Sequence, residues 1–289
     1  MIDWPDSLVM DLARRRAILF LGSGVSKNSV SAVDGTKRPP TWDEFLRLGL
    51  DRCSTPKRHI QTLISQQKFL LACEILKEKL DESWNEIVHE TFVDPKFQPA
   101  EVHESIFKLD SRVVLTQNVD KIYDAYATTE SSGTVYVKDY SKTDVGLVVR
   151  GDRRSVLKAH GSVDTPGEMI FTGEEYAAAR YQFSRFFLLL DALSVTHTFL
   201  FLGCGLTDPD VHLMLERNSH HFPGSRPHYM VTPSKSVHDD VQTCYKRNMN
   251  LRFLTYKAKD NHVELKESLK ELAVLVDNAR EELSKTRDW

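Results

Sequence analysis

Three short runs of mostly apolar residues constrain the fold of this chain more than any other feature. They occupy residues 17–21, 112–116 and 198–202, and each ends in a cluster of glycine or polar residues. Apolar runs of this length without alternation are typical of strands buried on both faces of a parallel sheet. Segments with helical spacing separate them. The pattern predicts an α/β fold, with a Rossmann-like parallel sheet that carries helices on both faces.

Weaker signals complete the predicted organisation. Further strands are predicted at residues 155–158, 169–172, 228–232 and 252–256. From residue 41 to residue 109 the apolar spacing is helical, and Thr41 with Glu44 predicts a capping box at its start. We therefore expect one domain over residues 1–289, enlarged by a helical insert at 41–109.

Composition excludes several classes of protein. Lys and Arg number 38 against 41 Asp and Glu, a net charge of −3, which argues against direct nucleic-acid binding. No apolar run reaches the roughly 18 residues that a membrane span needs, and the first residues lack the charge order of a secretory signal. Four cysteines lie far apart without a CxxC pair, at Cys53, Cys73, Cys204 and Cys244. We expect a cytoplasmic protein without disulfides or zinc.

Two of the strand ends carry paired glycines. Gly22 and Gly24 follow the first run, and Gly203 and Gly205 follow the third. Glycine lets a backbone approach a phosphate closely. However, Lys27 stands where the dinucleotide fingerprint has its third glycine, so the first motif alone fits a plain turn equally well. In the second motif, helix capping is the favoured role of Thr207.

The other two strand ends carry polar side chains. Gln117, Asn118 and Asp120 follow the second run, where a capped turn is the simplest interpretation. His160, next to Gly161, follows the strand predicted at 155–158, a setting suited to acid–base chemistry. No spacing typical of metal-ligating histidines occurs.

The four motifs gain specificity from their order along the chain. GSGVS, TQNVD, HG and GCGLTDPD each follow a predicted strand. This order resembles the NAD-binding fold of the sirtuins, in the zinc-lacking Sir-two-like branch found in bacterial anti-phage defence. Members of that branch are NAD hydrolases, and some pair with a HerA-type ATPase. The chain lacks the zinc module of sirtuin deacylases, and residues 28–40 replace their cofactor loop, so peptide-lysine binding is not expected.

The resemblance implies a site and a reaction. NAD is the expected substrate, without zinc, and hydrolysis gives nicotinamide and ADP-ribose. Asn118 is expected to contact the nicotinamide ribose and orient a water, and His160 to act as a base. Asp120 is expected to bind the nicotinamide carboxamide. The predicted NAD-binding residues are Gly22, Ser23, Gly24, Ser26, Gln117, Asp120, Gly203, Gly205 and Thr207.

Alternative functions remain open at this point. The same fold could serve a zinc-independent deacylase, an ADP-ribosyltransferase, or a silent NAD- or ADP-ribose-binding scaffold. Nucleic-acid binding through the basic clusters at 14–16 and 150–154 is disfavoured by the net charge. We expect NAD as ligand, a homo-oligomer as the assembly, a HerA-type ATPase as a candidate partner, and no membrane contact. The helices at 41–109 and at the C-terminus are the expected subunit contacts.

Overall fold

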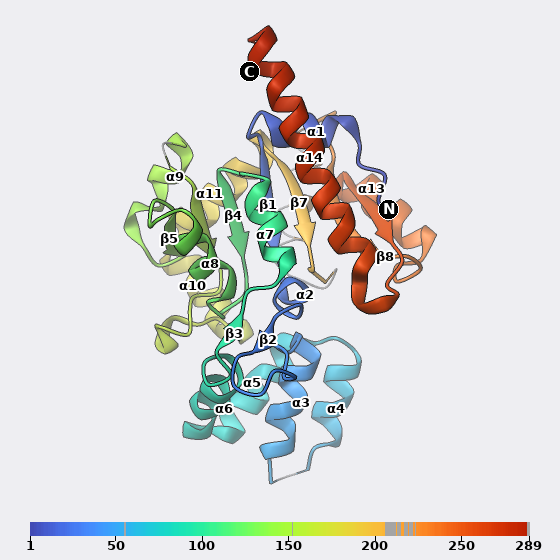
Figure 1. Ribbon diagram of the computed structural model, residues 1–289. Coiled ribbons are helices and arrows are strands. Elements are labelled where there is room, and N and C mark those ends of the chain that lie inside the picture. Colours follow the sequence, from blue (N-terminus) through green and yellow to red (C-terminus); the bar gives the residue numbers. More distant parts are fainter. Residues whose placement is uncertain are drawn as a thin grey trace.

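A seven-stranded parallel sheet forms the centre of the molecule (Figure 1). The computed structural model describes residues 1–54, 56–151, 153–205, 212, 215–216, 219, 222 and 224–287. The strand order is β5-β6-β4-β1-β7-β8-β9, and every neighbouring pair is parallel. The strands are β1 (Ala17–Leu21), β4 (Val113–Thr116), β5 (Tyr136–Asp139), β6 (Ser155–Lys158), β7 (Thr198–Leu202), β8 (His228–Pro233) and β9 (Leu251–Tyr256). The predicted α/β fold with a Rossmann-like sheet is confirmed.

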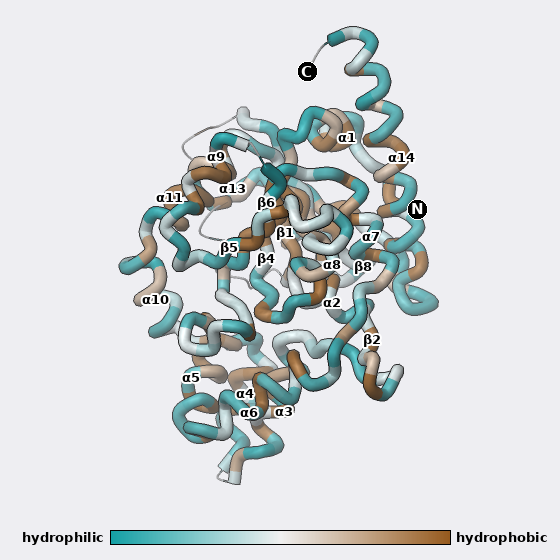
Figure 2. Tube along the Cα trace, turned by 60° about the vertical axis from the view of Figure 1, so that its left-hand side comes forward, coloured by the Kyte–Doolittle hydropathy of each residue, from teal (hydrophilic) through white to brown (hydrophobic). Residues whose placement is uncertain are grey.

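Helices cover both faces because successive strand residues point in opposite directions. Leu19 and Leu200 face one layer, whereas Phe20 and Phe201 face the other. The first layer consists of α1 (Asp6–Ala13), α7 (Glu101–Lys108), α8 (Ile122–Glu130) and α14 (Val263–Thr286). The second consists of α9 (Leu147–Arg150), α10 (Gly173–Gln182), α11 (Ser184–Thr196) and α13 (Asp239–Met249). In Figure 2 the apolar positions gather in the sheet and on inward helix faces.

Four helices pack around a separate core at the carboxyl end of the sheet (Figure 1). They are α3 (Trp42–Arg52), α4 (Arg58–Ser65), α5 (Phe69–Leu80) and α6 (Glu82–Phe92), and we call them the helical module. Phe45 and Trp84 meet edge to face in its centre, with ring centroids 5.4 Å apart. The helix α7, which follows, packs against α14 instead. Residues 41–109 thus contribute to two layers, and their description as one insert stays a prediction.

The predicted capping box at the start of the helical module is confirmed. The Glu44 carboxylate accepts hydrogen bonds from the Thr41 N–H at 2.8 Å and from its hydroxyl at 3.0 Å. Burial alone would raise the pKa of Glu44, but the Lys27 ammonium and the Thr41 donors outweigh it and lower that pKa. The box therefore fixes where α3 begins. Its Glu44 carboxylate also accepts a hydrogen bond from Lys27, which ties the loop after β1 to the helical module.

One predicted strand is wrong, and one strand of the seven-stranded sheet was missed. Residues 169–172 form no strand, because their backbone donors go elsewhere: Ile170 N–H to the His160 carbonyl at 3.0 Å, and Phe171 and Thr172 to the Glu175 carboxylate. Thr172 then caps α10. The missed strand is β5, an edge strand whose Tyr136 is exposed.

Short elements complete the described chain. The strands β2 (Val30–Ser31) and β3 (Phe97–Gln98) form a separate antiparallel pair. The helix α2 (Ser23–Ser26) follows β1 directly, and 3₁₀ turns occupy Thr143–Gly146, Pro166–Glu168 and Asp260–His262. Across the described residues, no helix combines the length and apolar character needed to cross a bilayer.

Candidate active site

The topology opens a crevice between β1 and β7. These strands are neighbours, but β1 is followed in the sheet by β4 on one side, and β7 is followed by β8 on the other. In open α/β sheets, ligands bind outside the carboxyl ends of the strands at such a switch point. The two glycine motifs follow these two strands. The sheet therefore brings the loops after residues 21 and 202 together, although 180 residues of chain separate them.

The two glycine loops contact each other through backbone atoms. The Gly24 N–H donates to the Gly203 carbonyl, and the Gly22 N–H to the Leu202 carbonyl, each at 3.0 Å. A Cβ on Gly22 would lie 2.5 Å from the Gly203 oxygen. Gly203 itself has a φ of +64°, and a Cβ there would lie 2.5 Å from the Val25 nitrogen. Glycine is required at these positions for the loops to approach at all.

Side-chain hydrogen bonds hold the turn that carries Asn118. The Asn118 Nδ2 donates to the Gly22 carbonyl at 3.0 Å and to the Ser26 Oγ at 2.9 Å. The Ser26 hydroxyl donates in turn to Asp120 Oδ2 at 2.8 Å, and Asp120 Oδ1 accepts the Ile122 N–H at 3.0 Å. Ser26 and Asp120 are both buried. With its nitrogen used in this way, Asn118 presents its carbonyl oxygen as the acceptor for a ligand or water.

Gln117 adds a buried amide beside this turn. Its side chain is 8% exposed, and its Nε2 has no hydrogen-bond partner among the described residues. It lines a small recess together with Ser23, Trp42 and Asn118. A buried donor without a protein acceptor is rare in folded proteins and is commonly satisfied by water or a ligand.

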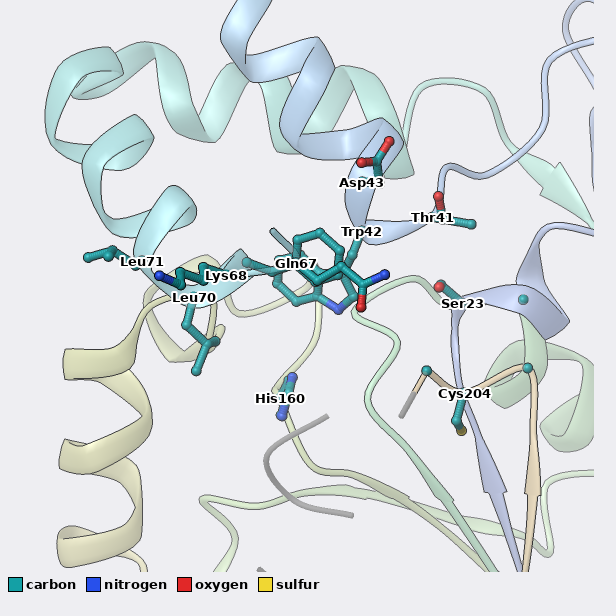
Figure 3. A pocket seen from close by; sticks show the side chains of 14 residues that line it. Ser23, Thr41, Trp42, Asp43, Gln67, Lys68, Leu70, Leu71, His160 and Cys204 are labelled. Atoms are coloured by element: carbon teal, nitrogen blue, oxygen red, sulfur yellow. The ribbon is translucent and has the colours of Figure 1, made fainter. Parts of the chain in front are cut away.

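His160 lies two residues beyond the end of β6 and is 4% exposed. Its ring meets the edge of Tyr176, with centroids 6.1 Å apart. Gly161 beside it has a φ of +77°, and a Cβ there would lie 2.4 Å from the Glu168 carbonyl oxygen. This glycine lets the chain turn tightly after the histidine. Figure 3 shows His160 across a pocket from Trp42, with Ser23 and Cys204 to one side.

Two neighbouring cavities meet over the glycine loops. One has a volume of about 530 Å³ and is lined by Ser23, Trp42, Lys68 and His160. The other has a volume of about 610 Å³. Gly24 and Gly203, together with Thr41, Gln67, Phe69, Cys204 and Gly205, line both. A single elongated space therefore runs from His160 across the glycine loops and beyond.

The far end of this space is formed by β8, β9 and the start of α14. Thr232 and His262 line it, and the hydroxyl of Thr232 is buried without a partner among the described residues. The Tyr256 hydroxyl lies 2.8 Å from the His262 Nδ1, and burial raises the pKa of Tyr256 to about 12. Asn261 and His262 both have positive φ. This end thus offers hydroxyl, amide and imidazole groups beside apolar walls.

The structure brings together every predicted site residue that it describes. Thr207 lies outside the described residues. The thiol of Cys204 donates to the Phe20 and Leu202 carbonyls, each at 3.5 Å, as expected of a packing residue. The described residues include no group of three His, Cys, Asp or Glu side chains arranged to hold a metal.

Sequence reasoning missed the contributions of the helical module and of β8. Trp42 and Gln67 line the cavity from α3 and from the corner between α4 and α5, and Thr232 from the end of β8. The Trp42 position lies beside the capping box, which the sequence did indicate. Gln67 lies there because its backbone φ is +58°. The sequence does not indicate this turn, because the residue is not a glycine.

Comparison with known proteins agrees with this geometry. The family model of the SIR2-like domain matches residues 112–254. A protein named NAD(+) hydrolase ThsA from Acinetobacter baumannii (strain 532279) is 28% identical over 135 residues, which are 46% of this chain and 28% of that protein. ThsA from Bacillus cereus (strain MSX-D12) is 27% identical over 157 residues, 54% of this chain and 32% of that protein.

The chain thus spans about a third of the length of these two relatives, or less. The matched family model begins one residue before β4 and extends into β9, so it includes the turn of Asn118, His160 and the second glycine loop. Residues 112–254, which contribute Asn118, His160 and the second glycine loop to the site, are thus similar to the SIR2-like domain.

Proposed function

We propose that the chain hydrolyses NAD, cleaving the bond between nicotinamide and ribose. The observation that carries this proposal is the elongated space that crosses the glycine loops, with His160 at one end and Asn118 in the small recess that shares Ser23 and Trp42 with it. A dinucleotide has two nucleoside halves joined by a pyrophosphate, and glycine loops at strand ends are suited to the phosphates. The names of the two relatives support the same reaction.

Cleavage of this bond develops positive charge on the ribose, as in other glycoside hydrolysis. The nicotinamide leaves with the bonding electron pair, and a water supplies the hydroxyl of ADP-ribose while releasing a proton. We assign the Asn118 oxygen to orient the water or the ribose, and His160 to accept a proton from water or a ribose hydroxyl. No zinc is needed for these steps.

The remaining residues would hold the substrate. We assign Gly22, Ser23 and Gly24 to the phosphates, and Gly203 and Gly205, with Thr207, to the adenosine side. Asp120 and Gln117 would bind near the nicotinamide carboxamide, where Gln117 offers its buried N–H. Ser26, also predicted at the phosphates, is only 3% exposed, and we assign it the further task of holding Asn118.

The biological proposal follows from the resemblance to defence proteins. Hydrolysis would deplete NAD in an infected bacterial cell and so limit phage growth. A homo-oligomeric assembly, a HerA-type ATPase partner and a cytoplasmic location belong to the same proposal. The net charge of −3 favours contact with nucleic acid through a partner rather than by this chain.

The test is a product analysis. The chain is incubated with NAD, and nicotinamide and ADP-ribose are separated by chromatography. Asn118→Ala and His160→Ala should each lower the rate about 100-fold or more. His59→Ala, on an exposed face of α4, is the matched control and should leave the rate unchanged.

Three outcomes would contradict the proposal. Full activity in His160→Ala would remove the assigned base. Label from NAD on the polypeptide instead of free ADP-ribose would indicate ADP-ribosyl transfer. NAD binding by calorimetry without nicotinamide release, in the presence of a cell extract from infected bacteria, would indicate a silent scaffold.

A further inference from the structure

A buried ion pair lies beside the Asn118 turn and beneath His160. Lys158, the last residue of β6, is 2% exposed, and Asp124 on α8 is 6% exposed. The Lys158 Nζ lies 3.4 Å from Asp124 Oδ2 and also donates to the backbone carbonyl of Asp120. Burying an ammonium group costs several kcal/mol unless its donors are satisfied. An apolar pair would fill this space without that penalty, so the pair calls for a specific role.

The pair connects the turns that follow β4 and β6. The sheet by itself holds these turns together only where they leave their strands. Asp120 lies two residues after Asn118, and Lys158 lies two residues before His160. Its ammonium therefore joins the turn of the first predicted catalytic residue to the strand that carries the second. A backbone hydrogen bond from Val163 to the Val119 carbonyl, at 3.0 Å, ties the same turns further along.

Asp124 keeps the lysine in place. Burial raises the pKa of Asp124, the Lys158 charge lowers it, and nearby Asp120 raises it again. The carboxylate in turn gives the ammonium a partner in a region closed to water. Asp124 thereby allows the Lys158 donors to remain directed at both the carboxylate and the Asp120 carbonyl.

We propose that Lys158 and Asp124 are positioning residues, which set the distance between Asn118 and His160 by holding the Asp120 carbonyl against β6. Neither residue lines the cavities described above, so they act through the turn and not on the substrate. Reaction rates are sensitive to displacements of about 1 Å in the groups that orient a reacting atom. The proposal rests on the proposed function only for its kinetic readout.

The first test is the double variant Lys158→Met with Asp124→Asn, which removes the donors without leaving a lone buried charge. We expect nicotinamide release to fall about 10-fold or more in kcat, with KM for NAD within about 2-fold of wild type. Lys158→Arg keeps charged N–H donors and should restore part of kcat. Asp11→Asn is the control, because Asp11 is a buried carboxylate that contacts Thr198 and Arg226 at the opposite edge of the sheet.

The second test does not depend on turnover. Hydrogen exchange should become faster in the peptide spanning residues 117–122 of the double variant, and stay unchanged there in Asp11→Asn. Absence of nicotinamide release by the wild type in the presence of the extract from infected bacteria would reject the proposed function, while the exchange measurement still tests whether Lys158 holds the two turns together. A double variant that keeps wild-type kcat, or wild-type exchange at 117–122, overturns the positioning role. If the double variant does not fold, the same two readouts are applied to Lys158→Arg against Asp11→Asn. A partly lowered kcat together with faster exchange at residues 117–122 supports the role, and a wild-type value of either readout overturns it.

Discussion

The four loops that carry the sequence motifs, after β1, β4, β6 and β7, are of two kinds. The loops after β1 and β7 meet through backbone atoms, with the Gly24 N–H on the Gly203 carbonyl. The turns after β4 and β6 are instead fixed by side chains, through the chain of bonds that joins Asn118, Ser26 and Asp120 and through the Lys158 ion pair. The first pair of loops depends on the absence of side chains, and the second on their chemistry.

The two kinds of loop therefore respond differently to substitution, although they belong to the same site. Close backbone contact has no charge to titrate and no rotamer to order, but it tolerates no added atom. Side-chain networks tolerate small changes of shape, but they fail when a donor or acceptor is lost inside the protein. We expect steric substitutions to be most damaging at the glycine loops, and isosteric polar substitutions to be most informative at the polar turns.

The largest effect should come from Gly203→Ala. The new Cβ would meet the Val25 nitrogen at 2.5 Å in a residue with a φ of +64°. We expect a loss of about 3 kcal/mol or more in unfolding free energy, from the clash and the left-handed backbone together. Denaturant unfolding measures this loss.

Gly133→Ala is the control for backbone strain alone. Gly133 has a φ of +78°, but nothing lies within 4 Å of its added Cβ. We expect a loss of about 1 kcal/mol. Equal losses at the two glycines would show that contact between the glycine loops contributes nothing.

Acid should destabilise the protein without acting on either kind of loop. Burial lowers the pKa of His228 from 6.5 to about 4. As pH falls from 6.5 to about 4, the unfolded chain takes up a proton that the folded chain does not, so stability present above pH 6.5 is lost in this window. At pH 5 the expected loss is about 2 kcal/mol for this histidine.

Urea unfolding at pH 7 and pH 5 measures that loss. His228→Asn keeps an acceptor for the Phe199 N–H, which the His228 Nδ1 accepts at 3.0 Å, and should remove this part of the acid sensitivity. The remainder should come from His103, whose pKa burial lowers to about 4, and from His197, whose pKa burial also lowers. An unchanged acid response in His228→Asn would contradict the assignment.

Ser26→Ala and Ser23→Ala sharpen the comparison within one short helix. Ser26 bridges Asn118 and Asp120, whereas Ser23 lines the cavity. Ser26→Ala should cost about 1 to 2 kcal/mol in stability and lower kcat about 10-fold, because it releases the Asn118 amide. Ser23→Ala should raise KM for NAD and leave stability nearly unchanged. Identical kinetics in the two variants would show that the two serines have one role.

The smallest effects are expected at two helix starts. The capping boxes of Thr41 on α3 and Thr172 on α10 are alike, but only Thr41 lines the cavities. Each change to Ala should lower the melting temperature by the equivalent of about 1 kcal/mol. Only Thr41→Ala should also raise KM for NAD. A KM change in both variants would mean that loosening any helix start disturbs the site.

The most buried strands were predictable because a strand that is buried on both faces needs mostly apolar residues. The bounds of β1, β6 and β7 match the predicted runs residue for residue. The edge strand β5 escaped prediction because it is only partly buried, and the polar residues Lys138 and Asp139 leave it without an apolar run. The segment 169–172 resembles a strand because it is apolar. However, Met169 and Phe171 are buried in the core of the helical module and not in the sheet.

The sequence by itself determined most of the strands, the glycine positions and the capping box, because each depends on neighbours within a few residues. It also placed Asn118 and His160 at strand ends. Only the tertiary structure decided that Gly22 is needed against Gly203, that Trp42 and Thr232 line two adjoining cavities, and that Lys158 reaches the Asp120 carbonyl. These residues lie 38 to 190 positions apart in the chain, and the order of strands in the sheet, which no local pattern encodes, brings them together.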